Sequence, residues 1–170
     1  MDYFFISQDL RIPNRVEPVG LTGLLRQSHQ EDDEDDDLIQ VYVKTHQDSE
    51  YVDFIERPVP LASDPLKKVL MKFEKRANFT PIVLADLQRQ VQTLYWMINP
   101  PKLQCLAADT EFNKNGTIKR VVIDSEKVRG YRLFQIGGIM ENLTGINLVV
   151  AEGILRRYLT GFKLTPIEYE

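Results

Sequence analysis

The strongest constraint on the fold is a match between the two halves of the chain. Shifted by 85 residues, half of the 170-residue length, residues 66–82 align on residues 151–167 without a gap. Four of the seventeen aligned positions are identical, and the apolar positions stay in phase throughout. Such a self-match predicts a repeated structural unit. The alternative is that two unrelated helices share an apolar stripe by chance.

Each copy has the pattern of a helix followed by a strand. In the first copy, four apolar residues recur at the spacing of one helix face: Leu66, Val69, Leu70 and Phe73. Asp64 is the predicted N-cap, and Pro65 suits the first helical position. The spacing predicts helices over 66–77 and 151–159, with Gly161 ending the second.

Short apolar or alternating stretches elsewhere predict strands. They cover residues 3–7, 38–46, 50–57, 79–86, 89–99, 118–123, 131–138, 146–150 and 162–170. The pair Asn115-Gly116 predicts a tight turn that leads into the strand at 118–123. With 43% hydrophobic residues, the chain can bury a core. We therefore expect one α+β domain with a mostly antiparallel or mixed sheet and two short helices, built from a duplicated strand–helix–strand unit. Its expected parts are a mobile loop at 8–37 and half-repeats at 38–86 and 118–170.

A run of seven acidic residues interrupts this pattern. It consists of Glu31, Asp32, Asp33, Glu34, Asp35, Asp36 and Asp37. The run lacks the glycine and the spaced oxygens of a calcium loop, so we favour a hydrated, metal-free loop. Weak divalent-cation binding and a docking surface for a basic partner are the alternatives.

Composition limits the partners and the compartment. Without the run, 18 acidic and 21 basic residues remain, so the body is nearly neutral and lacks the basic footprint of a nucleic-acid binder. The single cysteine, Cys105, allows no internal disulfide and fits a reducing compartment. No signal peptide and no apolar membrane-spanning stretch is apparent. We expect a cytoplasmic protein that binds neither membrane nor nucleic acid.

The sequence contains no catalytic, metal-binding or cofactor-binding motif that would support enzyme chemistry. None of the five serines lies in a G-x-S-x-G elbow, and Cys105 has the setting of a core residue. No phosphate-binding loop is present, so no cofactor or metal is expected. A hydrolase whose Ser or Cys site is assembled from distant residues stays open as an alternative.

One aromatic pair is a candidate for partner contact. Tyr95 and Trp96 form an apolar block that ends at Pro100 and Pro101. Tyrosine and tryptophan dominate binding hot spots, but the same block suits a core strand, which we favour. The candidate partner-binding residues are therefore the acidic run, Tyr95 and Trp96.

The order of these motifs resembles a known family. The stretches YWMIN at 95–99, FQIGG at 134–138 and GFKLTPI at 161–167 carry the resemblance, which extends from about residue 41 to the end. They resemble the bacterial immunity proteins numbered as family eleven in polymorphic toxin systems. The resemblance implies an α+β protein of the bacterial cytoplasm that binds a cognate toxin domain directly and stoichiometrically, without catalysis. A basic toxin would suit the acidic run, and a structural or adaptor protein is the other alternative.

Overall fold

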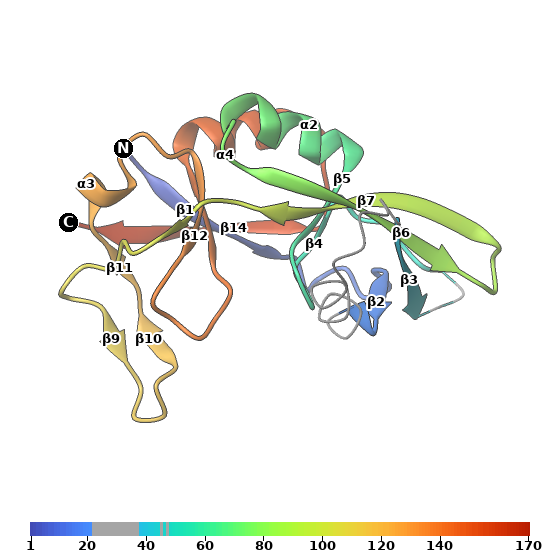
Figure 1. Ribbon diagram of the computed structural model, residues 1–170, viewed down its shortest axis with the longest axis horizontal. Coiled ribbons are helices and arrows are strands. Elements are labelled where there is room, and N and C mark those ends of the chain that lie inside the picture. Colours follow the sequence, from blue (N-terminus) through green and yellow to red (C-terminus); the bar gives the residue numbers. More distant parts are fainter. Residues whose placement is uncertain (22–37, 45, 47) are drawn as a thin grey trace.

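Two six-stranded sheets carry the fold, and helices α2 and α4 lie side by side over them (Figure 1). The computed structural model describes residues 1–21, 38–44, 46 and 48–170. Within this part of the chain, the helices are α2 (Asp64–Phe73), α3 (Ser125–Val128) and α4 (Leu148–Leu155). The predicted α+β class is confirmed.

The first sheet has the order β11-β14-β1-β13-β12-β8. Its strands are β11 (Val122–Ile123), β14 (Phe162–Tyr169), β1 (Tyr3–Gln8), β13 (Thr144–Asn147), β12 (Leu133–Ile136) and β8 (Lys102–Leu103). A separate hairpin of β9 (Glu111–Phe112) and β10 (Ile118–Arg120) projects from this end of the molecule (Figure 1). The predicted turn at Asn115 and Gly116 lies between these two strands, where Gly116 has a positive φ of 82°.

The second sheet has the order β2-β3-β6-β7-β5-β4. Its strands are β2 (Glu17–Val19), β3 (Ile39–Lys44), β6 (Asn78–Asp86), β7 (Val91–Asn99), β5 (Leu61–Ser63) and β4 (Phe54–Ile55). The hairpin of β6 and β7 extends past α2 (Figure 1).

Five strands of each sheet follow the same plan. Helix α2 joins β5 to β6 with the antiparallel β7 between them, and α4 joins β13 to β14 with the antiparallel β1 between them. Outside these, β3 runs parallel to β6 as β11 does to β14, and β4 is antiparallel to β5 as β12 is to β13. The middle strands differ in origin, because β7 follows β6 directly whereas β1 comes from the other end of the chain.

The matched prolines hold equivalent places in the two sheets. Pro81 lies one residue before the pairing of β6 with its parallel neighbour begins, at Ile82. Pro166 lies two residues before the corresponding pairing of β14 begins, at Glu168. A proline has no N–H to donate, so it is tolerated in a strand where the neighbouring strand has not yet begun.

Three clusters of buried side chains fill the structure. The central one lies beneath the two helices and draws on both sheets, with Ile6 and Ile146 from the first, Ala62 and Ile98 from the second, and residues of α2 and α4. A second cluster lies on the face of the second sheet that points away from the helices. A third, which includes Cys105, lies on the corresponding face of the first sheet. The two sheets therefore share one core under a common helical layer.

Helices α2 and α4, the two that the sequence predicts, both begin earlier than predicted. The N-cap of α2 is Ser63, whose hydroxyl accepts a hydrogen bond from the Leu66 N–H at 3.3 Å, so Asp64 is the first helical residue. The helix ends at Phe73 because Glu74 is extended. In the second copy, the predicted strand over 146–150 ends at Asn147, which caps α4 by accepting from Val150.

Residues 8–21 are only partly a loop: Gln8 ends β1 in the first sheet, and β2 (Glu17–Val19) belongs to the second, with turns between them. β2 pairs with β3, and the side chains of Val16 and Leu21 are fully buried in the second cluster. This corrects the expectation for the first part of residues 8–37, whose apolar residues are spaced too widely to give a strand pattern. Residues 22–37 lie outside the described part of the chain, and the half-repeat boundaries stay a prediction.

Candidate partner-binding surface

The second sheet has an uncovered apolar surface where β6 and β7 run past α2. Side chains directly opposite on neighbouring strands share a face, and alternate residues of a strand share it too. Starting from Trp96, which contacts α2, this rule places one set of side chains on the helix side of the sheet. The part of this set that lies beyond α2 is here called the open face, and it consists of Glu17, Val19, Gln40, Tyr42, Lys44, Pro81, Val83, Ala85, Gln92, Leu94 and Trp96. Ala85 is buried, and the charged residues Glu17 and Lys44, opposite each other, lie at the outer end.

Large apolar side chains of the open face are exposed. Val19 is 55% exposed, Tyr42 53% and Leu94 42%. Val19 is opposite Tyr42, Tyr42 is opposite Ala85 two residues from Val83, and Val83 is opposite Leu94. The exposed residues are therefore neighbours on one face rather than scattered. A contiguous apolar surface of this kind is typical of an interaction site, whereas single exposed apolar residues need no explanation.

The first turn of α2 borders the open face. The Lys67 ammonium lies 3.1 Å from the centroid of the Trp96 ring, in a cation–π contact. One residue on, Lys68 pairs with Asp64 at 2.6 Å, and this hydrogen bond is the main cause that holds the pKa of Asp64 below its usual range. Lys67 has no carboxylate within 4.0 Å among the described residues.

The equivalent region of the first sheet is charged instead of apolar. Pro166 corresponds to Pro81, so the position two residues further along, Glu168, corresponds to Val83. Glu168 is exposed and forms an ion pair with Arg120 on β10, which holds the pKa of Glu168 below its usual range. The shared topology thus does not require an apolar residue at this place.

Tyr95 and Trp96, the two aromatic residues singled out from the sequence, point to opposite faces of β7. Tyr95 is buried, and its hydroxyl donates to the backbone oxygen of Val52 at 2.7 Å. Burial, followed by the charge of Asp53, raises the pKa of Tyr95. Trp96 is partly exposed and belongs to the open face. The acidic residues 31–37 lie outside the described residues.

Tyr42, Val83 and Leu94 were not singled out from the sequence. A signal was present in the alternation of β7, where Leu94 shares the phase of Trp96 and not that of Tyr95. The sequence could not show that α2 stops short of this row. Exposure depends on where the covering layer ends, and that is a property of the packed structure.

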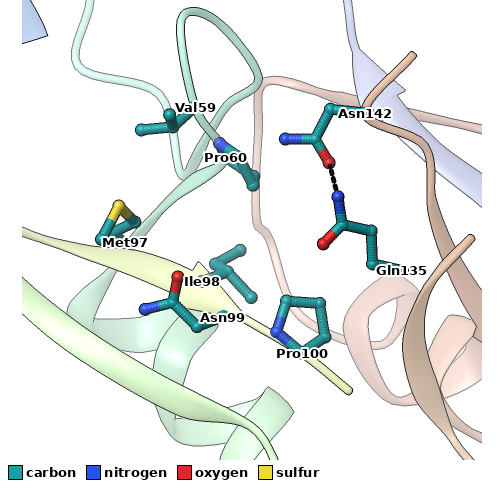
Figure 2. Close-up of a pocket in the computed structure, with 8 residues that line it drawn as sticks. All are labelled: Val59, Pro60, Met97, Ile98, Asn99, Pro100, Gln135 and Asn142. Carbon is teal, nitrogen blue, oxygen red and sulfur yellow. Dashed lines mark hydrogen bonds between the residues drawn. The ribbon is translucent and has the colours of Figure 1, made fainter. Parts of the chain in front are cut away.

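One open cavity of about 250 Å³ lies where the two sheets meet (Figure 2). It is lined by Val59, Pro60, Met97, Ile98, Asn99, Pro100, Gln135 and Asn142. The Gln135 amide donates to the Asn142 side-chain oxygen at 2.9 Å, as Figure 2 shows. Its lining side chains are apolar or amide, and none of them can act as a general acid or base near neutral pH.

A second cavity, of about 410 Å³, lies beside α3. It is lined by Met1, Tyr3, Ser125, Glu126, Arg129, Gly130, Tyr131, Arg132 and Asn147. Three of the lining side chains bond to neighbouring protein atoms: Ser125 donates to the Glu170 main-chain oxygen at 2.6 Å, and Glu126 pairs with Arg129 at 3.3 Å. No histidine is among the described residues that line this cavity, so the Ser–His pairing that activates a serine nucleophile is not formed there.

Outside these two cavities, the described candidate nucleophiles and metal ligands form no further reactive site. Cys105 is fully buried, and burial raises the pKa of its thiol to about 11. The Ser49 hydroxyl donates to the backbone oxygen of His46 and not to its ring. Among the residues that the structure describes, no group of three or more His, Cys, Asp or Glu side chains could hold a metal ion.

Comparison with known proteins assigns no family. No family model matches the sequence, and no curated protein matches it. In the described part of the chain, every helix is too short or too polar to cross a membrane.

Proposed function

We propose that this protein neutralises a cognate bacterial toxin domain by binding it directly and stoichiometrically, without turnover. The open face is the observation that carries this proposal. It offers a partner several exposed apolar side chains, a tryptophan and a lysine in one place. Aromatic and apolar residues at the centre of an interface with charged groups at its rim are the usual composition of binding hot spots.

The resemblance in motif order supplies the kind of partner. The stretches that resemble the immunity family include YWMIN, and Trp96 of that stretch belongs to the open face. A toxin made by the same bacterium would have to be met in the cytoplasm, which agrees with the lone cysteine in its reduced state. Binding alone is sufficient for such a role, because a covered toxin cannot reach its target.

Co-expression with a neighbouring toxin gene tests the proposal. The toxin domain encoded next to this protein is expressed from an inducible promoter, with and without this protein, and survival is counted. We expect this protein to restore growth and to co-purify with the toxin in a one-to-one complex measured by native mass spectrometry. An unrelated acidic protein of similar size is the control and should give neither effect.

The dose dependence separates binding from catalysis. In a purified toxin assay, stoichiometric inhibition reaches completion at one molecule of this protein per toxin molecule. Full inactivation by a small fraction of that amount would show turnover and favour the hydrolase alternative. A toxin that neither binds nor loses activity would refute the proposed function.

A further inference from the structure

We propose that the open face receives a single amphipathic helix of the toxin, whose apolar side rests on Tyr42, Val83 and Leu94 and whose acidic side meets Lys67. This inference rests on the proposed function and adds to it the part of the partner that is bound and the chemistry of that part.

The size of the open face fits one helix. It spans four strands, β2, β3, β6 and β7, or about 14 Å at the usual strand spacing. Along β7 it runs from Trp96 to Gln92, about 13 Å. A helix is about 10 Å across and rises 1.5 Å per residue, so two to three turns cover this area.

The layering of the protein favours a helix over a strand. The open face is the surface of the sheet and not its edge, and the surfaces of sheets are covered by helices or by other sheets. Helix α2 already covers the neighbouring rows, and it begins close to Trp96. A bound helix would extend the layer that α2 and α4 form in Figure 1.

The charge beside the open face selects an acidic helix. The first five residues of α2, which border the open face, contain Lys67 and Lys68 and one acidic residue, Asp64. Lys68 is paired with Asp64, whereas Lys67 is held over the Trp96 ring without a carboxylate within 4.0 Å among the described residues. A partner carboxylate at this place would form an ion pair with Lys67 where the apolar contact excludes water.

Selection of displayed peptides tests the inference without the toxin. Helix-constrained peptides of about eleven residues are displayed on phage and selected against the complete protein. We expect the enriched sequences to carry apolar residues at i, i+3 or i+4, and i+7, together with Asp or Glu. Failure to enrich helical binders, or enrichment of basic ones, would refute the inference.

Matched variants locate the binding surface. Leu94→Arg places a charge in the centre of the open face and should weaken the selected peptides at least tenfold. Lys67→Glu should weaken them about fivefold or more, whereas Lys72→Glu, an exposed change on the same helix, should leave binding nearly unchanged. Because Leu94 is already 42% exposed, we expect the melting temperature of Leu94→Arg to stay within a few degrees of wild type. Equal loss in both lysine variants, or none in Leu94→Arg, would contradict the inference.

Repeating the variants in the toxin assay distinguishes the two proposals. If wild type and Leu94→Arg protect cells equally well, the proposed function stands and the inference is wrong. If wild type fails to protect, the proposed function is wrong, and the peptide data alone decide what the open face binds. If wild type protects and folded Leu94→Arg does not, both are supported.

Discussion

At the scale of single residues, burial decides which chemical groups can act. Cys105 is enclosed in the third cluster, where its thiol packs as a small apolar group. Glu74 is also buried, but its carboxylate accepts hydrogen bonds from the Arg76 side chain at 2.7 and 3.0 Å and from the Arg132 N–H at 3.0 Å. The thiol therefore stays unreactive, whereas the carboxylate stays charged and ties the end of α2 to the segment before β12.

We predict that Cys105 does not react with a thiol reagent in the folded protein. Burial raises the pKa of its thiol to about 11, so at pH 8 only roughly one molecule in a thousand carries the reactive thiolate. Ellman's reagent should label no thiol in native protein and one thiol in concentrated guanidinium chloride. Rapid labelling of the native protein would revive a cysteine hydrolase as the alternative function.

Glu74 should make stability depend on acid pH. Burial by itself would raise the pKa of Glu74, but the hydrogen bonds from Arg76 and Arg132 outweigh it, so the pKa lies below its usual range. A lowered folded-state pKa gives stability that is present above about pH 4.5 and is lost as the pH falls through the folded value. Glu74→Gln should cost about 1–3 kcal/mol near pH 7, and urea unfolding should show this cost shrinking towards pH 3.

Glu126→Gln is the matched control for this prediction. Its ion pair with Arg129 is about three-quarters exposed on both sides, so its removal should change stability little. A cost of Glu74→Gln that is independent of pH would contradict the proposed role of its charge.

At the scale of elements, side-chain capping sets where α2 and α4 begin. Ser63 and Asn147 are the last residues of β5 and β13, and each side chain accepts from an N–H in the first turn of the helix that follows. The same arrangement in both copies explains why strand and helix follow without a loop. In the second copy it also explains how Val149 and Val150, residues that favour strands, come to lie in a helix.

Ser63→Ala should destabilise the protein more than Asp64→Ala. Ser63 caps α2 and also donates to Asp53, so its loss should cost about 1 kcal/mol or somewhat more. Asp64 is not the cap, and its ion pair with Lys68 is largely exposed, so we expect its replacement to have a smaller effect. Urea unfolding of the two variants measures the difference, and a larger cost for Asp64→Ala would restore it as the N-cap.

At the scale of the whole molecule, close contacts between the two sheets hold the halves together. The loop before β14 packs against the segment before β4: Asp53 donates its N–H to Thr160 and accepts at its carboxylate from the Thr160 N–H. Next to them, Gly161 has a φ of 89°, and a Cβ there would lie 2.5 Å from Val52 and 2.9 Å from the Phe54 backbone oxygen. Only glycine allows this approach.

We predict that Gly161→Ala costs more than Gly130→Ala. Gly130 also has a positive φ, 84°, but a Cβ there meets nothing within 4 Å. Its replacement should cost about 1–2 kcal/mol for the backbone conformation alone. At Gly161 the clash with a neighbouring backbone adds to that, for a total of about 2–4 kcal/mol. Equal losses in urea unfolding would show that the contact between the halves contributes little.

Several features of this protein followed from local sequence. The helical spacing of Leu66, Val69 and Leu70, the alternation of β3 and β14, and the Asn-Gly turn each depend on interactions among neighbouring residues, and all were predicted. The matched segments Thr80-Pro81-Ile82 and Thr165-Pro166-Ile167 likewise predicted a repeated unit, and the strands around α2 and α4 have the same order in the two sheets, while the duplication itself stays a prediction. Each of these elements depends on residues that are close together in the sequence, so each could be recognised from its own stretch of the chain.

Other features were decided only by the tertiary structure. No local signal places β1, from the start of the chain, between β13 and β14, since that pairing joins residues more than 130 positions apart. Nor does the sequence show that Tyr95 is enclosed while Tyr42 and Leu94 are exposed. Strand order and exposure depend on which distant segments pack together and where a covering layer ends, so they arise only when the whole chain is folded.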